Sequence, residues 1–372
     1  MTMVKIEQIE LLLLELPYVH FFETSFGREQ GRTFILVKVY ADGICGYGEV
    51  VADKAPLYSY ETTSTAWLML KDYFIPLIKA NAVHDPLNFS RLAGKYKGHP
   101  MAKAGMELAL WDLEGKRKQQ PLWKIYGGTK QEILSGVSVG IQDTMDELIR
   151  RIEEFLSEGY GRIKIKIKPG WDVDVCRKLR QEFPDILLQA DANGGYTIAN
   201  IDILKNLDEF GLQMLEQPFP AYDLWDHSRL QKEMKTPICL DESAVSADSV
   251  RKALEMGSCR IINIKVGRVG GVHEAIKIHD LCCGRGIPVW CGGMLESGIG
   301  RAHNLHLATL PNFKLHNDLS ASKRYYKEDL IDPAIDITPQ GTIIVPNDPG
   351  IGVNPVEDRI RKASLKREVF KF

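Results

Sequence analysis

The second half of the chain repeats a strand-and-helix pattern about every 25 residues. From residue 134 onward, short β-type runs alternate with segments whose apolar residues recur every three or four positions, such as 145–157 and 272–282. The strand-like runs are 134–141, 162–168, 186–191, 212–216, 238–241, 261–265, 287–291 and 313–317. Strands that alternate with helices indicate βαβ units, and eight of them predict a (β/α)8-type barrel. A doubly wound sheet is the alternative, disfavoured because no strand precedes a glycine-rich dinucleotide turn.

The residues before this repeat follow a different order. Runs 33–40 and 44–49 flank Ala41, Asp42 and Gly43, which predicts a hairpin with Asp-Gly at its turn. Helical patterns follow at 62–78 and 101–117. Strands followed by helices predict an α+β domain over residues 1–130, packed on a barrel over 131–322. The tail, 323–372, includes a strand-like run at 342–346, has no barrel strand left to pair with, and is expected to return to the first domain.

Composition and charge exclude several classes of protein. The 372 residues include 47 Lys and Arg against 49 Asp and Glu, so the net charge of −2 creates no field for nucleic acid or an anionic membrane. The four leucines at 11–14 are too few for a signal peptide or a membrane span, and a strand or buried turn is expected there. The seven cysteines form no CxxC pair, which predicts reduced thiols and a cytoplasmic location.

Charged residues end consecutive strand-like runs in nearly constant phase. Lys166, Asp191, Glu216, Asp241 and Lys265 are separated by 25, 25, 25 and 24 residues. One βα unit has about this length, so all five are expected at one level, at the carboxyl ends of the strands, where barrel active sites lie. Each acid taken alone is explained equally well as a cap of the helix that follows it.

The three acids together predict a metal site. Asp191, Glu216 and Asp241 would converge on one space, where like charges do not coexist ionised without a cation. A ligand set made only of oxygen atoms favours a hard divalent ion, with Mg2+ as the default and Mn2+ as the alternative.

The lysines add bases to this site. Ile and Lys alternate over 163–168, which turns Lys164 and Lys166 toward the barrel interior and lets Lys168 reach solvent. An edge strand with a solvated lysine face is the alternative, but a closed barrel has no edges. Lys265 ends the sixth run and is expected to face Lys166 across a metal-bound carboxylate. A cation and a second lysine nearby favour a neutral amine, so this arrangement predicts removal of a proton next to that carboxylate.

These motifs resemble the enolase superfamily, and the resemblance covers nearly the whole chain. The Lys-x-Lys of the second run and the lysine of the sixth are similar to the muconate lactonizing enzyme subgroup. More narrowly, several stretches resemble o-succinylbenzoate synthases and the related N-acylamino acid racemases: 24–27, 55–59, 164–171, 237–243, 263–271 and 290–294. The resemblance implies an α/β fold, a modified TIM barrel (β/α)7β with an N-terminal α+β capping domain to which the C-terminal segment returns.

Carried over residue by residue, the resemblance assigns the metal ligands. Asp191, Glu216 and Asp241 become the Mg2+ ligands, and Asn193 and Glu242 become the residues that support them.

The resemblance also assigns the lysines. Lys166 becomes the principal acid and base, Lys265 the lysine on the opposite face, and Lys164 the cation that lowers the pKa of Lys166. Val266 departs from the proline expected in relatives, which should change the stiffness of the loop and not the chemistry.

Substrate recognition is expected from loops. In the family, two early loops of the cap close over the barrel mouth, and the glycine-rich loop 292–297 could hold a succinyl carboxylate on its backbone N–H groups. The residues implicated are Phe22, Phe26, Val50, Tyr58, Gly293, Met294 and Leu295. For the four cap residues, burial in the cap core is the alternative. His303, His306 and the thiols are interpreted as structural.

The reaction implied is the Mg2+-dependent dehydration of 2-succinyl-6-hydroxy-2,4-cyclohexadiene-1-carboxylate to o-succinylbenzoate through an enediolate, in menaquinone biosynthesis. The alternative is N-succinylamino acid racemization, which can share the site. Muconate cycloisomerase and dipeptide epimerase are disfavoured, because we expect no carboxylate in 292–297 placed to grip an α-amino group. A non-catalytic scaffold is disfavoured by the cost of burying unused charges, and a metal-dependent binding protein stays open. We expect a small carboxylate substrate, no nucleic acid or membrane partner, and a homo-oligomer.

Overall fold

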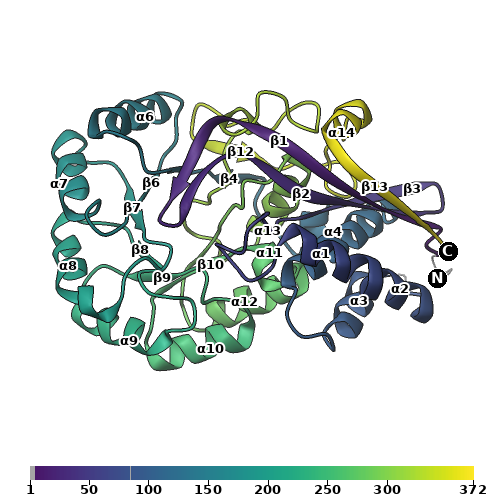
Figure 1. Ribbon diagram of the computed structural model, residues 1–372, viewed down its shortest axis with the longest axis horizontal. Coiled ribbons are helices and arrows are strands. Elements are labelled where there is room, and N and C mark those ends of the chain that lie inside the picture. Colours follow the sequence, from purple (N-terminus) through teal and green to yellow (C-terminus); the bar gives the residue numbers. More distant parts are fainter. Residues whose placement is uncertain (1–4, 84) are drawn as a thin grey trace.

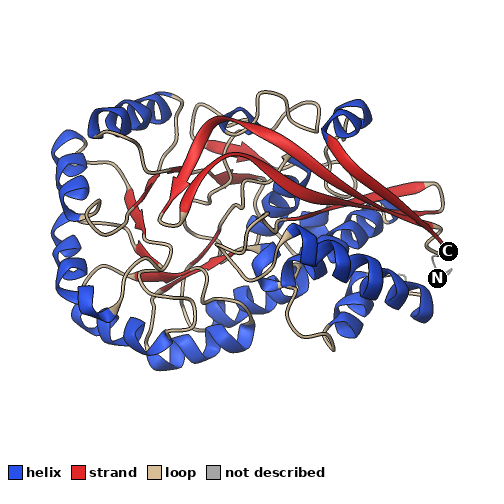
Figure 2. Ribbon diagram, in the orientation of Figure 1, coloured by secondary structure: helices blue, strands red, loops and turns tan. Residues whose placement is uncertain are grey.

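The computed structural model describes residues 5–83 and 85–372, which form an α+β cap beside a barrel of parallel strands (Figures 1 and 2). The cap sheet is antiparallel, in the order β13-β1-β2-β3. Its strands are β1 (Gln8–Thr24), β2 (Gly27–Ala41), β3 (Ile44–Val50) and β13 (Ser364–Lys371). The predicted hairpin is confirmed, since Asp42 and Gly43 join β2 to β3 with φ angles of 51° and 72°, a conformation that glycine adopts freely and aspartate tolerates.

Both faces of the cap sheet are buried, which explains the leucines at 11–14. Leu11 packs in the core formed with the cap helices, whereas Leu12 and Leu14 belong to the core shared with the barrel. Successive side chains of a strand point to opposite faces, so a strand covered on both sides is apolar at consecutive positions. The strand expected there is confirmed. Among the described helices, none combines the length and apolar composition needed to span a bilayer.

The cap helices follow the strands, as predicted. They are α1 (Thr63–Met69), the π-helical turn η1 (Leu70–Phe74), α2 (Ile75–Asn81), α3 (Pro86–Ala93), α4 (Pro100–Arg117) and α5 (Leu122–Tyr126). Helix α4 packs directly on β3 through glycines. A Cβ atom on Gly48 would lie 2.1 Å from the carbonyl oxygen of Gly105, and one on Gly105 would lie 2.3 Å from Cγ2 of Val50. The two backbones can approach this closely only because these side chains are absent.

The strand and helix alternation predicted for the second half is confirmed. Seven parallel strands form a curled sheet in the order β11-β10-β9-β8-β7-β6-β5. They are β5 (Val137–Val139), β6 (Ile163–Lys166), β7 (Leu188–Asp191), β8 (Leu215–Glu216), β9 (Ile238–Leu240), β10 (Ile261–Ile264) and β11 (Val289–Cys291). Helices form an outer arc around these strands (Figure 1). The fold is therefore the expected α/β barrel of the (β/α)7β type.

The helices of this half differ widely in length. In chain order they are α6 (Met145–Ser157), α7 (Val173–Glu182), η2 (Ile198–Asn200), α8 (Ile201–Lys205), η3 (Asn206–Phe210), α9 (Leu224–Glu233), α10 (Ala247–Met256), α11 (Val266–Val269), α12 (Val272–Gly284), α13 (Gly298–Ala308) and η4 (Ser322–Arg324).

The eighth predicted run closes the barrel without forming a regular strand. Phe313 makes an isolated parallel bridge with Val289 of β11, and Asn317 makes one with Ser135 ahead of β5. The side chain of Asn317 accepts a hydrogen bond from the backbone N–H of Cys291 at 2.7 Å and donates one to the carbonyl of Leu134 at 3.2 Å. These hydrogen bonds of the Asn317 side chain join the segment to β11 and to the chain ahead of β5, in place of a continuous ladder of backbone hydrogen bonds. The first run is likewise divided, into β4 (Glu132–Leu134) and β5.

The tail returns to two different places. Strand β12 (Thr342–Ile344) pairs with β4, so the expectation that 342–346 reaches the first domain was wrong. Strand β4 leaves the barrel ahead of β5, and β12 covers the backbone groups of its edge. After α14 (Glu357–Ala363), β13 pairs with β1 of the cap sheet.

The close packing of α4 on β3 predicts that Gly48→Ala lowers the free energy of unfolding by about 2 kcal/mol or more. The new Cβ would meet backbone atoms, the oxygen of Gly105 at 2.1 Å and the nitrogen of Ala109 at 2.6 Å, which cannot rotate away. Urea unfolding followed by circular dichroism measures this loss. Gly284→Ala in α12 is the control, because nothing lies within 4 Å of its added Cβ. Equal urea midpoints for the two variants would contradict the packing described.

Candidate active site

The five in-phase residues come together at the carboxyl ends of β6 to β10. Lys166 pairs in register with Asp191, and Asp191 with Glu216, across neighbouring strands. Asp241 and Lys265 directly follow the last residues of β9 and β10. All five are buried, with exposures between 0% and 7%. Parallel strands joined by connections of nearly equal length therefore carry these side chains to one end of the barrel.

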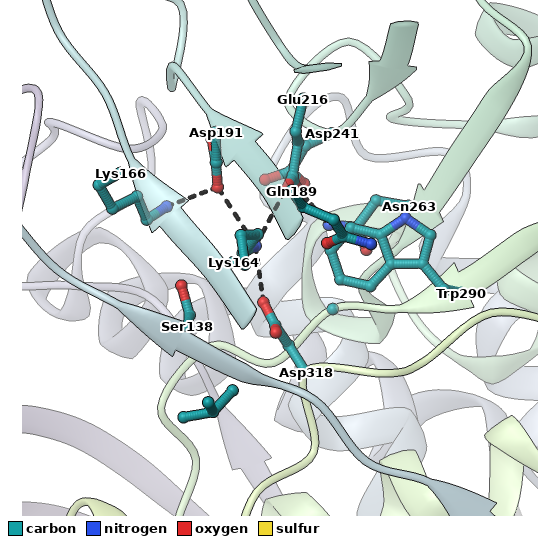
Figure 3. A network of polar contacts seen from close by, with 12 residues as sticks. Ser138, Lys164, Lys166, Gln189, Asp191, Glu216, Asp241, Asn263, Trp290 and Asp318 are labelled. Atoms are coloured by element: carbon teal, nitrogen blue, oxygen red, sulfur yellow. Dashed lines mark hydrogen bonds and ion pairs between the residues drawn. The ribbon is translucent and has the colours of Figure 1, made fainter. Parts of the chain in front are cut away.

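Lys164 lies among three carboxylates (Figure 3). Its Nζ atom is 2.6 Å from Asp318, 2.9 Å from Glu216 and 3.2 Å from Asp191, and 4.8 Å from the ring centroid of Trp290. Burial alone would lower the pKa of Lys164, but Asp318, Glu216 and Asp191 outweigh it and raise that pKa above its ordinary value. Lys164 is therefore a cation in this arrangement.

Lys166 has two partners at the edge of the network. Its Nζ atom donates to Oδ2 of Asp191 at 2.6 Å and to Oδ1 of Asn193 at 2.7 Å. The amide nitrogen of Asn193 in turn donates to Oε1 of Glu242 at 3.0 Å. The positive φ of 45° at Asn193 is one that asparagine tolerates, and it folds the chain after β7 back toward the site. Asn193 thus joins the lysine to Glu242.

Lys265 occupies the other side of the same carboxylates. Its Nζ atom is 2.8 Å from Oδ2 of Asp241 and 4.6 Å from the ring centroid of Tyr58. Burial disfavours the charged form, yet Tyr58 and the nearby carboxylates raise the pKa of Lys265 above its ordinary value. The hydroxyl of Tyr58 donates to Oδ1 of Asp241 at 3.2 Å, and the Arg268 guanidinium pairs with the same oxygen.

Three charged residues of this network, Arg162, Arg268 and Asp318, were not predicted from the sequence. Arg268 lies in the short helix α11, three positions after Lys265, which is the residue that precedes this helix. Asp318 follows the eighth run directly, and its two oxygens lie 2.6 Å from Arg162 and 2.6 Å from Lys164. Burial would raise the pKa of Asp318, but the two cations lower it to about 2. Its position at the end of a barrel strand was the signal available in the sequence.

The three predicted metal ligands are suited to a hard cation, although in this structure basic side chains form ion pairs with them. As they stand, no three His, Cys, Asp or Glu side chains within 5–83 and 85–372 form a metal site. The ammonium groups of the three lysines and the guanidinium group of Arg268 pair with the carboxylate oxygens instead. Oδ2 of Asp241 is buried and accepts no hydrogen bond from the described residues, even with Lys265 2.8 Å away. The donor set, all carboxylate oxygen, fits Mg2+ in charge and chemistry.

A cavity of about 210 Å³ lies over these residues, between the cap and the barrel mouth. Lys164, Lys166 and Lys265 line its floor. Of the predicted substrate residues, six line it: Phe22, Phe26, Tyr58, Gly293, Met294 and Leu295. Val50 does not line the cavity, and this part of the prediction needs correction. Its side chain is fully buried in the cap core, against α4.

The tip of the β1–β2 hairpin forms part of the roof of this cavity. Its Glu23 carbonyl accepts a hydrogen bond from the backbone N–H of Ile141 at 3.0 Å. The Glu23 carboxylate pairs with Arg28 at 2.7 Å and with Lys168 at 3.3 Å. Lys168, whose side chain is 41% exposed, lies at the rim of the barrel. The contacts of Glu23 with Ile141 and Lys168 hold the tip, which carries Phe22 and Phe26, against the barrel.

Some polar groups of the loop 292–297 already have hydrogen-bond partners within the protein. The loop does contain a carboxylate, Glu296, which accepts hydrogen bonds from the N–H of Met294 at 2.8 Å and from Asn304 at 2.9 Å. The N–H groups of Gly293 and Leu295 have no acceptor among the described residues. These two amides are therefore the candidates in this loop for holding an anionic group.

The remaining titratable residues singled out in the sequence are structural. Nε2 of His303 contacts the carbonyl of Tyr47 at 2.8 Å, and Nε2 of His306 contacts that of Ile351 at 3.0 Å. Burial lowers the pKa of both histidines to about 4. The seven cysteines are all free thiols.

Comparison with known proteins places this fold and site in a family. Residues 8–127 match the mandelate racemase / muconate lactonizing enzyme N-terminal domain, and residues 147–359 match the enolase C-terminal domain-like family. The chain belongs to the mandelate racemase / muconate lactonizing enzyme family of the enolase superfamily, whose enzymes generally use a divalent metal.

Individual relatives are similar over nearly their whole length. An o-succinylbenzoate synthase of Geobacillus kaustophilus is 53% identical over 99% of this chain and 98% of its own. An N-succinylamino acid racemase of Thermus thermophilus is 45% identical over 94% and 95%. The solved structure of an enolase superfamily member from Listeria innocua has a TM-score of 0.95 and 40% identity, covering 99% of both chains.

The network predicts a pH-dependent loss of stability in Asp318→Asn. The folded-state pKa of about 2 lies below the value of about 4 in the unfolded chain, so this stabilisation is complete above about pH 4 and is lost toward pH 2. We expect the variant to lose about 3 kcal/mol or more at pH 7, because two buried cations lose their anion. The difference from wild type should shrink as the pH falls from 4 to 3.

Urea unfolding at several pH values between 3 and 7 measures this difference. Asp174→Asn is the matched control, because its side chain is 93% exposed and its pair with Arg177 is solvated. A difference between Asp318→Asn and wild type that is the same at every pH would show that the ion pairs of Asp318 do not stabilise the fold.

Proposed function

We propose that this chain is an o-succinylbenzoate synthase, which dehydrates 2-succinyl-6-hydroxy-2,4-cyclohexadiene-1-carboxylate for menaquinone biosynthesis. The observation that carries the proposal is the placement of Lys166 and Lys265. Both line one cavity, and three strands, β7, β8 and β9, separate β6 from β10 in the sheet. The two amines therefore face each other across the space above the carboxylates. The relatives that bear this name support the same reaction.

The proposed ligands of Mg2+ are Asp191, Glu216 and Asp241, with Asn193 and Glu242 beside them. A bound Mg2+ would supply Lewis-acid stabilisation of the negative charge that gathers on the substrate carboxylate when the adjacent proton leaves.

Lys166 is the proposed acid and base for the dehydration. As a neutral amine it takes the proton from the carbon that carries the ring carboxylate, and the C–H bond breaks. The C–O bond to the hydroxyl of the next carbon then breaks, and the ammonium of Lys166 gives its proton to the leaving oxygen, so that water departs. The ammonium of Lys164, which shares Asp191 with Lys166, supplies a second positive charge near this amine. Lys265 supports the developing negative charge from the other face.

N-succinylamino acid racemization is the second candidate for the same site. The opposed lysines favour it, because one can take the α-proton from one face while the other returns a proton to the opposite face. Relatives of that name are 45% and 43% identical to this chain. Dipeptide epimerization is disfavoured, because it needs a carboxylate that can bind the α-amino group. Asp318 is already paired with Arg162 and Lys164, and Glu296 already accepts a hydrogen bond from the N–H of Met294.

Two further proposals rest on the sequence. The free state of all seven thiols supports a cytoplasmic location. A homo-oligomer with small carboxylate substrates, and without nucleic acid or membrane partners, remains the expected form.

The proposed metal site predicts that activity depends on a divalent cation. Excess chelator should abolish dehydration by the purified protein, and added Mg2+ should restore it. Asp241→Asn should bind Mg2+ at least about tenfold more weakly, because one ligand charge is lost. Calorimetric titration with Mg2+ measures this, with the exposed Asp202→Asn as control. Turnover in excess chelator, or unchanged affinity in Asp241→Asn, would remove the metal from the reaction.

The opposed lysines predict stereochemically separate defects. Arginine keeps a positive charge but does not act as a base near neutral pH. Lys265→Arg should therefore still exchange the α-hydrogen of one enantiomer of an N-succinyl amino acid with solvent deuterium, through Lys166, while racemization is lost. Lys166→Ala should lose dehydration and keep exchange only in the other enantiomer. Proton NMR in deuterium oxide follows both reactions. Equal exchange into both enantiomers by Lys265→Arg would exclude Lys265 as the second base.

A further inference from the structure

We propose that Tyr58, a residue of the cap, is a positioning residue for Lys265, and that it makes one of the two proton transfers depend on the cap. This inference rests on the proposed function. It adds a residue that holds one of the two lysines in place, which the proposed reaction alone does not identify.

Tyr58 lies in the loop between β3 and α1, a part of the cap that extends to the barrel mouth. The backbone N–H of Thr63 donates to the carbonyl of Asp53 at 2.8 Å and closes the base of this loop. Leu57 and Tyr60 on the same loop are 56% and 66% exposed, whereas Tyr58 turns inward. Its hydroxyl reaches Oδ1 of Asp241 at 3.2 Å, and its ring faces the Nζ atom of Lys265 at 4.6 Å from the centroid.

The ring matters because Lys265 has few other partners. Among the described residues, its ion-pair partner is Asp241, at 2.8 Å. If Asp241 binds a divalent cation, that carboxylate is shared with the metal and the ammonium is repelled from it. The face of an aromatic ring attracts a cation without offering a ligand to the metal. Tyr58 is then the contact that keeps the amine pointing into the cavity.

The other two lysines have comparable partners outside the proposed ligand set. Lys164 has Asp318 at 2.6 Å, and Lys166 has Oδ1 of Asn193 at 2.7 Å. Both of these partners come from the barrel. Only the partner of Lys265 comes from the cap, so the two bases that face each other are held by different parts of the molecule.

Loss of the ring should therefore affect one enantiomer more than the other. A misplaced amine loses catalytic rate steeply with distance, by about a hundredfold for a shift of about 1 Å. Tyr58→Leu removes the ring, and Lys166 keeps both of its own partners. We expect exchange through Lys265 to slow at least about tenfold more than exchange through Lys166. Tyr58→Phe keeps the ring and should leave the ratio of the two rates within about twofold of wild type.

The experiment measures solvent-deuterium exchange into N-succinyl-L-phenylalanine and N-succinyl-D-phenylalanine separately, with Mg2+ present. The enantiomer served by Lys265 is identified as the one whose exchange disappears in Lys265→Arg. Tyr60→Leu is the matched control, because it makes the same change two residues along the loop at an exposed side chain. Circular dichroism and Mg2+ calorimetry on each variant report on fold and metal binding independently of turnover.

A tenfold or greater change in the ratio of the two rates in Tyr58→Leu, with a wild-type ratio in Tyr58→Phe and Tyr60→Leu, supports the proposal. An unchanged ratio in Tyr58→Leu, or an equal change in Tyr58→Phe, overturns it. If Tyr58→Leu does not fold, the ratio in Tyr58→His decides, since its smaller ring should shift the ratio in the same direction. Failure of the proposed function looks different, because the wild-type protein would then not dehydrate 2-succinyl-6-hydroxy-2,4-cyclohexadiene-1-carboxylate.

Discussion

The pairing of buried charges at the barrel mouth is the constraint on which the site depends. The acids gathered there are Asp191, Glu216, Asp241, Glu242 and Asp318, and the bases are Arg162, Lys164, Lys166, Lys265 and Arg268. Each of these acids except Glu242 forms an ion pair with at least one base, and Glu242 accepts a hydrogen bond from Asn193 instead. A buried ion without a partner costs several kcal/mol, about 3–5 when one member of a pair is removed. The barrel meets this constraint because its strands end at one level. The residues of the site are therefore fixed as a set.

The cap depends on the same region in a different way. The central strands of its sheet, β1 and β2, are buried on both faces, one against the cap helices and the other toward the barrel. This arrangement leaves the hairpin tip and the loop before α1 as the parts that reach the cavity. Phe22 and Phe26 arrive from the tip and Tyr58 from the loop. The barrel thus supplies the charged floor, and the cap supplies an aromatic roof. The two are joined at Asp241, which Tyr58 touches.

The barrel, and the charged residues at the carboxyl ends of its strands, could be predicted from the sequence because both follow from a repeat. A constant unit length puts Lys166, Asp191 and Glu216 in cross-strand register, and the two-residue period of a strand turns Lys164 inward. Other features carry no such period. Arg268 reaches the site from a one-turn helix, and Asp318 from a segment whose bonds are partly made by the Asn317 side chain. Local sequence does not encode which of several apolar cap residues faces a cavity, and Val50 was misplaced for that reason. The partner of β12 depends likewise on which edge the folded barrel leaves open.

The pairing of β13 with β1 also bears on how the chain acquires its shape during synthesis. Protein chains emerge from the ribosome from the N-terminus onward, and domains tend to fold as they appear. Strand β1 begins at Gln8, but its partner β13 ends at Lys371. During translation, one edge of the cap sheet is therefore exposed while the whole barrel is being made. Glu10, which pairs with Arg367 of β13 in the folded protein, places a charge on that edge strand, and charges on an edge strand disfavour pairing with other chains.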